Sequence, residues 1–440
     1  MITEPDDKPP YSYKTPMHAY QTDGLHITLD KEGSHRFSKV SYPVRYGRYS
    51  EIETPEYLFQ LNLNGEIKFI QGRGQTWPDR LEWLKRTVAD DWVYYSTGGY
   101  SGVFDAFGEY YLPCLSYPSN SITVRNPFED PAVRTAIDSW WDLQARLKQQ
   151  IPRVSPQPLR QFLTVVCAHD AVYLAKRALE LHHVIGGNVS VLPPDSRHVD
   201  YEVIPVNVAD GCLYHCAFCR VKSGRSFTPR TKRNIMEQVR NLKAFYGRDI
   251  RNYNAVFLGQ HDALNAEPEH LEFAAHYCYE KFGFDHSHVQ GASLFLFGSV
   301  DSLIRASDTL FDRLQELPFS TYINIGFESA DPETLAMIKK PLTPELVDTA
   351  FSRMLEVNRR YDRIEITGNF LFADRLPPGH LDAFLELTRK RVPHPYSKGT
   401  IYFSPFGGDS ERQQRGMLRK FYKIKALSPL PTYLYLIQRL

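Results

Sequence analysis

From residue 199 onward, short apolar segments of strand length alternate with longer segments of helical period. The six predicted strands are 200–208, 254–258, 292–297, 320–327, 363–372 and 400–405. The helices predicted between them are 232–245, 267–281, 302–316, 344–358 and 378–390. Such alternation predicts a parallel sheet with helices outside it, curved or closed into a barrel. We therefore expect an α/β fold, a partial (β/α)6 TIM-like barrel over residues 199–410.

Three cysteines follow the first of these strands. Cys212, Cys216 and Cys219 form a C-x3-C-x2-C pattern with no fourth cysteine nearby. Three thiolates on one tight loop can hold three irons of a [4Fe–4S] cube, which leaves the fourth iron open to bind and activate another molecule. In barrels of this kind the working groups gather where strands end and loops begin. The cysteine loop is therefore expected on the functional face.

A structural zinc site is the competing interpretation, with His215 or a distant residue as the fourth ligand. Zinc sites favour paired C-x2-C half-sites that come together from separate parts of the chain. Here only one such pair exists, and a third cysteine precedes it at x3 spacing. The pattern favours an iron–sulfur cluster, while a non-catalytic, zinc-stabilised binding module remains an alternative of a different class.

Residues 1–185 are expected to form a separate α+β domain of unknown role. Apolar and polar residues alternate on both sides of Asn64-Gly65, which predicts a hairpin over 56–70. The helices expected in this half are 78–88, 130–150 and 159–184. The Tyr- and Gly-rich segment 91–120 is either a small packed core or part of a substrate lid.

Composition and the remaining segments indicate which partners and which location to expect for this protein. We expect a linker over 186–198 and a basic, helical tail over 411–440. Lys and Arg total 52 against 51 Asp and Glu, so no global field attracts nucleic acid or a membrane. Few scattered cysteines, no apolar leader and no apolar run of membrane length favour a cytoplasmic protein.

Taken together, the cysteine loop and the strand pattern resemble the radical SAM superfamily. Its signature C-x3-C-x-aromatic-C is met by Cys212, Cys216, Phe218 and Cys219. The chain is similar to the branch that includes methylthiotransferases and many metabolic and peptide-modifying enzymes. No cobalamin-binding signature appears in the sequence, which argues against the cobalamin-dependent subgroup.

Three further segments carry the resemblance. Residues 257–264 are similar to the loop after the second strand that meets the amino group of S-adenosylmethionine (SAM), and 325–329 resembles the fourth-strand IGxES motif. Residues 368–371 lie where the fifth strand of the family contacts adenosine. The resemblance implies these SAM contacts: Phe218, Gly259, Gln260, Asp262, Glu328, Ser329 and Asn369. Because many relatives carry two glycines and a glutamate where this chain has Gly259-Gln260-His261-Asp262, the group that binds the amine stays open.

The resemblance implies a reaction as well as a site. A [4Fe–4S] cluster on the three cysteines would cleave SAM reductively to methionine and a 5′-deoxyadenosyl radical, which takes a hydrogen atom from the substrate. The implied partners are a one-electron reductant, such as flavodoxin or ferredoxin, and a small-molecule or peptide substrate. An RNA- or protein-modifying member of the superfamily is the alternative, although the N-terminal half shows no basic RNA-binding domain.

Overall fold

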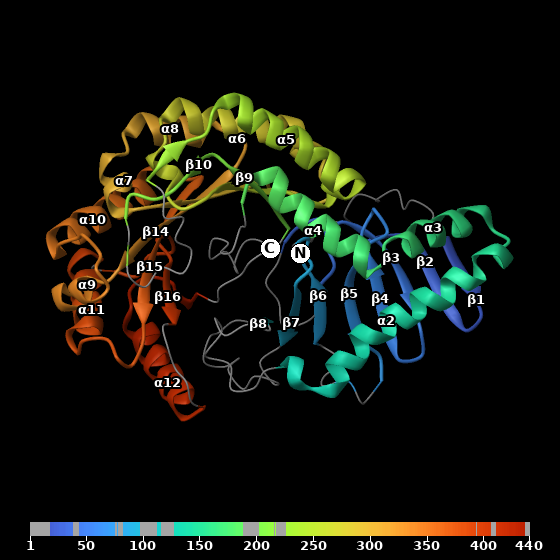
Figure 1. The fold of residues 1–440 in the computed structure, drawn as a ribbon. Helices are drawn as coiled ribbons and strands as arrows, with labels where there is room; N and C mark the ends of the chain where they lie inside the picture. The colour runs from blue at the N-terminus through green and yellow to red at the C-terminus, as the bar shows by residue number, and fades with distance from the viewer. Residues whose placement is uncertain are drawn as a thin grey trace, which may run out of the picture.

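The computed structural model contains two large sheets, one antiparallel and one parallel (Figure 1). The structure describes residues 18–37, 44–74, 77, 82–96, 112–115, 127–187, 202–214, 216, 226–392, 394–405 and 411–435. The antiparallel sheet comes from the N-terminal half of the chain, and the parallel sheet comes from the C-terminal half.

The parallel sheet confirms the predicted α/β barrel and adds one strand to it. Its order is β9-β12-β13-β14-β15-β16-β17, and every neighbouring pair is parallel. The strands are β9 (Val203–Asn207), β12 (Ala255–Gly259), β13 (Ser293–Gly298), β14 (Ser320–Glu328), β15 (Ile364–Phe372), β16 (Ile401–Pro405) and β17 (Thr432–Leu434). The first six match the predicted strands. The seventh, β17, comes from the C-terminal tail, where only a helix was predicted.

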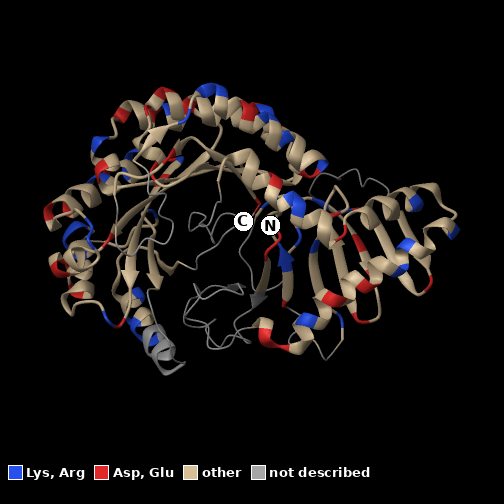
Figure 2. Ribbon diagram, viewed as in Figure 1, with Lys and Arg blue, Asp and Glu red and all other residues tan. Residues whose placement is uncertain are grey.

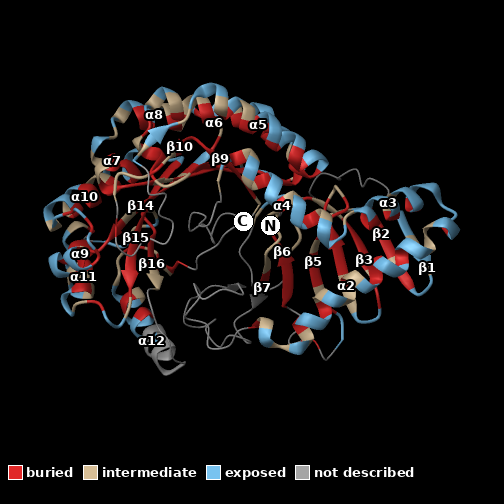
Figure 3. Cartoon of the chain, viewed as in Figure 1, coloured by how far each residue is buried: buried red, intermediate tan, exposed pale blue. Residues whose placement is uncertain are grey.

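Helices cover the outer side of this sheet, and their outer faces are exposed while the strands are buried (Figure 3). They are α5 (Lys232–Tyr246), α6 (Pro268–Phe282), α7 (Val300–Arg305), α8 (Asp308–Glu316), α9 (Pro332–Met337), α10 (Pro344–Arg360), α11 (Gly379–Arg391) and α12 (Glu411–Leu427). The single helix expected over 302–316 is two helices, because Ala306 and Ser307 between α7 and α8 adopt extended backbone. Basic and acidic residues are interspersed over these helices (Figure 2).

The N-terminal half forms an eight-stranded antiparallel sheet in which each strand pairs with the next along the chain. The strands are β1 (His18–Thr22), β2 (Leu25–Glu32), β3 (Arg48–Glu53), β4 (Tyr57–Leu61), β5 (Ile67–Gly72), β6 (Trp83–Arg86), β7 (Trp92–Ser96) and β8 (Leu112–Leu115). β4 and β5 are the predicted hairpin, with Gly65 at φ +80° in its turn. The expected helix over 78–88 is wrong, because residues 83–86 pair with β5 and β7 as a strand.

Three helices pack on this sheet: α2 (Pro131–Gln150), α3 (Gln157–Ala168) and α4 (Ala171–Ile185). The helix expected over 159–184 is broken at His169, and the Asp170 side chain starts α4 by accepting a hydrogen bond from the Tyr173 N–H. Trp140 of α2 is fully buried and lies 5.3 Å from Phe59 of β4, ring centre to ring centre. The α+β prediction for this half is therefore confirmed.

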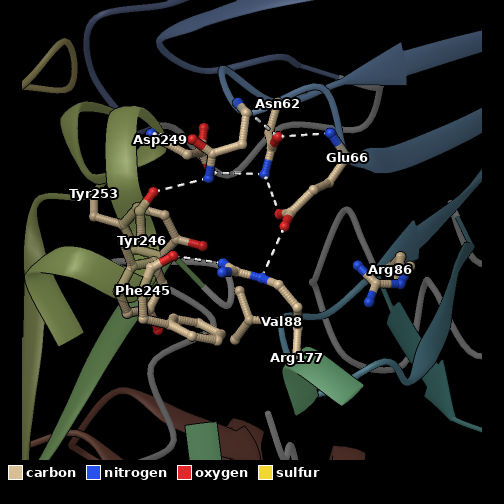
Figure 4. A pocket seen from close by; sticks show the side chains of 10 residues that line it. Asn62, Glu66, Arg86, Val88, Arg177, Phe245, Tyr246, Asp249 and Tyr253 are labelled. Atoms are coloured by element: carbon tan, nitrogen blue, oxygen red, sulfur yellow. Dashed lines mark hydrogen bonds and ion pairs between the residues drawn. The ribbon is translucent and has the colours of Figure 1, made fainter. Parts of the chain in front are cut away.

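A polar junction joins the hairpin turn 62–66 to the short 3-10 helix η4 (Gly247–Asn252), which ends shortly before β12 (Figure 4). Asn64 donates to the Tyr246 carbonyl at 2.9 Å and accepts from the Arg248 N–H at 3.0 Å. Asp249 accepts from the Leu63 N–H and from the Asn62 side chain, both at 3.2 Å. The junction therefore lies at the amino-terminal end of the parallel sheet, whereas the cysteine loop leaves the carboxyl end.

Candidate functional site

The two ends of the cysteine loop pair with each other where the loop begins and ends. After β9, the two-residue strand β10 (Ala209–Asp210) pairs with β11 (Thr228–Pro229), and Cys212 forms an isolated bridge with Ser226. Arg230 donates to both carboxylate oxygens of Asp210, at 2.9 and 2.6 Å, and to the Ile185 carbonyl at 2.7 Å. These contacts fix the ends of the loop against α4.

Two of the three cysteines belong to the described part of the loop. Cys216 is buried and Cys212 is half-buried. Burial raises the pKa of the Cys212 thiol to about 11, and nearby Asp262 and Cys216 add to the rise, while a hydrogen bond from the Tyr214 N–H opposes it. A bound metal reverses this balance, because a coordinating thiol is deprotonated. The predicted residues Phe218 and Cys219 lie outside the described residues.

The thiol groups fit the predicted cluster in their chemistry. Thiolates are the ligands of iron–sulfur clusters, and Cys212 and Cys216 are close enough for each to influence the charge of the other. Among the residues that the structure describes, no group of three or more His, Cys, Asp or Glu side chains is arranged to hold a metal. That set contains only two of the three cysteines of the motif.

Asp262 follows β12 and lies near Cys212. Its Oδ1 accepts the Ser299 N–H at 2.9 Å, whereas its buried Oδ2 has no hydrogen-bond partner among the described residues. Burial raises the pKa of this carboxyl, and hydrogen bonds from Ser302 and Ser299 oppose the rise. A buried oxygen without a donor is the arrangement that a cationic ligand would satisfy.

Gly259 and Gln260 lie beside α4 and β9 at the same end of the sheet. A Cβ atom on Gly259 would lie 2.5 Å from the Asn207 Oδ1 atom, so any other residue here would have to displace the Asn207 side chain. Gln260 is partly exposed and packs beside Gly187. A Cβ atom added to Gly187 would lie 3.2 Å from the Gln260 Nε2 atom. The contact with Asn207 favours glycine at this position, and the SAM contacts of Gly259 and Gln260 remain predictions.

Four polar side chains form a row across the carboxyl ends of β14, β15 and β16. The Lys340 ammonium donates to the Gly326 carbonyl at 2.7 Å and lies 3.2 Å from Glu328 Oε1. Asn369 donates to Glu328 Oε2 at 3.0 Å and accepts from the Ser404 hydroxyl at 2.8 Å. The structure thus brings the predicted Glu328 and Asn369 together. Sequence reasoning missed Lys340 and Ser404, although Lys340 belongs to the Ile338-Lys-Lys segment that follows the IGxES motif.

Ser329 has a different environment from Glu328. Its fully buried hydroxyl lies 2.7 Å from His380 Nδ1 and accepts the Asp331 N–H at 3.0 Å. His380 Nε2 lies 2.8 Å from the Leu371 carbonyl, which can only accept, so Nδ1 accepts the proton of the serine. Ser329 therefore helps to hold the loop after β14, and its contact with SAM remains a prediction.

A comparison with protein families identifies the domain that holds this site. Residues 206–370, from β9 to β15, match the family model described as the Radical SAM superfamily. The chain contains a radical SAM domain. Enzymes with this domain use a [4Fe–4S] cluster and SAM, and they need an electron donor and a substrate.

Among the described helices, none combines the length and the apolar character that crossing a membrane requires.

The radical SAM domain also resembles solved structures, but weakly. The cobalamin-dependent SAM radical enzyme OxsB is 17% identical with a TM-score of 0.32, over 50% of this chain and 30% of that one. A radical SAM methyltransferase from Sphaerobacter thermophilus is 15% identical with a TM-score of 0.35, over 53% and 65%. Coproporphyrinogen III oxidase from Escherichia coli is 10% identical with a TM-score of 0.34, over 51% and 52%. At such low sequence identities and TM-scores, the activities of these enzymes cannot be transferred to this chain. No curated protein matches the chain in sequence.

Proposed function

We propose that this chain is a radical SAM enzyme whose cluster is held by Cys212, Cys216 and Cys219. When bound, the cluster would supply the electron that cleaves SAM reductively and starts radical chemistry on a substrate. The observation that carries the proposal is the position of Cys212 at the carboxyl end of the sheet, close to the buried Asp262. This arrangement offers thiolates for iron next to a carboxylate for a cation.

The polar groups around the loop have separate roles in this proposal. Asp262 would bind the ammonium group of SAM through Oδ2, which has no partner among the described residues. Glu328 and Asn369 would bind the ribose hydroxyls or the amino acid part of SAM, and the contacts of Glu328 with Lys340 and Asn369 orient its side chain. Gly259 and Gln260 would contribute backbone and amide contacts, and Phe218 an apolar wall near the adenine.

A radical SAM enzyme also needs an electron donor and a substrate. A one-electron reductant such as flavodoxin or ferredoxin would reduce the cluster in a reducing, cytoplasmic environment. The substrate, a small molecule or a peptide, would be covered by the N-terminal unit, residues 1–185. That unit reaches the carboxyl end of the barrel through Ile185, whose carbonyl accepts from Asn207 and Arg230 at 2.9 and 2.7 Å.

Anaerobic reconstitution tests the proposal. The protein should bind about four irons per chain, and the reduced form should convert SAM to 5′-deoxyadenosine and methionine. Cys216→Ala should lose both the iron and the cleavage. Cys278→Ala is the matched control, because Cys278 is fully buried in α6, far along the chain from the motif, and this variant should keep both.

Two outcomes would reject the proposed function. Stoichiometric zinc with no iron after reconstitution would favour the zinc-stabilised binding module. Equal iron content and SAM cleavage in wild type and Cys216→Ala would show that the cysteine loop does not hold the cluster.

A further inference from the structure

Tyr214 lies inside the cysteine loop, two residues from Cys212 and two from Cys216. Its hydroxyl donates to the Asp301 carboxylate, and the Asp301 backbone N–H donates to the same hydroxyl at 3.2 Å. Asp301 lies in the first turn of α7, where backbone N–H groups have no partner within the helix. Ser299 is the N-cap of α7, and the tyrosine adds an acceptor in the first turn that ties the cysteine loop to the segment after β13.

Two further contacts hold the same side chain. The Lys340 ammonium lies 5.4 Å from the centre of the Tyr214 ring, within the range of a cation–π interaction. The Tyr214 N–H donates to Cys212 Sγ at 3.5 Å. One residue therefore connects a cysteine sulfur with the carboxyl ends of β13 and β14.

We propose that Tyr214 is a positioning residue that, through Asp301, holds the first two cysteines in place and tunes the reduction potential of the cluster. The inference rests on the proposed function, because it concerns the loop that would bind the cluster. Hydrogen bonds to cluster sulfurs help to set the reduction potential. They stabilise the reduced cluster, which carries more negative charge, so loosening the Tyr214 N–H contact lowers the potential.

Substitutions at both ends of the contact test this role. Tyr214→Phe removes only the hydroxyl, and a hydrogen bond to a charged group is strong enough that its loss should release iron to a chelator about tenfold faster. The midpoint potential, measured by a redox titration followed by electron paramagnetic resonance, should fall. Asp301→Asn keeps an oxygen acceptor without the charge, so its iron release should be about threefold faster.

A double-mutant cycle separates this contact from general destabilisation. If Tyr214 and Asp301 act through each other, Tyr214→Phe combined with Asp301→Asn should release iron no faster than Tyr214→Phe alone. Tyr422→Phe, at an exposed tyrosine on α12, is the matched control and should leave both measurements unchanged.

The possible results distinguish this inference from the proposed function. Unchanged iron release and midpoint potential in both Tyr214→Phe and Asp301→Asn would overturn the role of Tyr214 while the wild type still binds its cluster. Fully additive effects in the double variant would overturn it as well. A wild-type protein that binds no iron would instead reject the proposed function itself.

Discussion

Replacing Glu202 with glutamine should destabilise the protein by about 3–5 kcal/mol. Glu202 directly precedes β9 and contacts two lysines of the N-terminal sheet, Lys68 at 2.9 Å and Lys85 at 2.7 Å. The exposed fractions of these side chains are 13% for Glu202, 16% for Lys68 and 2% for Lys85. Glutamine keeps the volume but removes the charge, so the buried Lys85 and the partly buried Lys68 lose the carboxylate that both contact.

The pH dependence gives a second, independent measure of the same contact. Burial alone would raise the pKa of Glu202, but Lys68 and Lys85 outweigh it, and the pKa is lowered in the folded protein. A lowered pKa means that the carboxylate stabilises the fold above its unfolded pKa, about 4.3. This stabilisation is lost as the pH falls through the folded pKa. The difference between wild type and Glu202→Gln should therefore shrink in acid.

Urea unfolding followed by circular dichroism, at pH 7 and in steps toward pH 3, measures both effects. Glu237→Gln is the control, since Glu237 forms an exposed pair with Arg233 on α5 at 3.3 Å and should cost less than about 0.5 kcal/mol. A cost below about 1 kcal/mol for Glu202→Gln at pH 7 would refute the reasoning, as would a difference from wild type that does not change with pH.

Two other predictions concern the junction and the polar row. Burial raises the pKa of Asp249 to about 6, so the folded state favours the protonated acid, and stability should fall as the pH rises from about 4 to 6. In Asp249→Asn this loss of about 3 kcal/mol in the free energy of unfolding should disappear, as measured by urea unfolding at each pH. An equal loss in wild type and variant would contradict the prediction. Gly326→Ala should weaken SAM binding about tenfold in equilibrium dialysis, because its Cβ would lie 2.6 Å from Glu328 Oε1. Unchanged binding would count against a role for Glu328.

The barrel could be predicted because several local signals agreed. In the C-terminal half, the predicted strands are buried runs, and helices such as α6 and α10 begin with proline in the first turn. Thr231 and Thr343 cap α5 and α10 through their side chains. Each segment therefore had one favoured structure before any tertiary contact was considered.

The errors occurred where tertiary pairing decided between two local possibilities. Residues 83–86 have apolar residues at helical spacing with their neighbours, yet Trp83 and Lys85 share one face of a strand that β5 and β7 pair with. The three-residue strand β17 is too short for a sequence pattern, and its pairing with β16 alone defines it. Neither pairing is visible in the local sequence.

Some residues of the candidate site could be predicted from sequence motifs, and others depend on tertiary contacts. The motifs predicted Asp262 and Glu328, which follow predicted strands, and Asn369, which lies within the predicted strand 363–372. The contact of Tyr214 with Asp301 joins positions 87 residues apart, and that of Lys340 with Glu328 depends on the left-handed backbone of Glu328, at φ +66°. Such contacts follow from how the loops fold over the sheet, which no spacing in the sequence records.

The N-terminal unit contributes to the cysteine loop as well as to any substrate site. β9 is an edge strand of the parallel sheet, and edge strands need cover. Glu202 holds the start of β9 to the N-terminal sheet, and Ile185 of α4 accepts hydrogen bonds from Asn207 at its end and from Arg230. Because Arg230 also binds Asp210 at the base of the loop, a shift of α4 would be transmitted directly to Cys212. Contacts from the N-terminal unit therefore reach both ends of β9 and the base of the loop that carries Cys212.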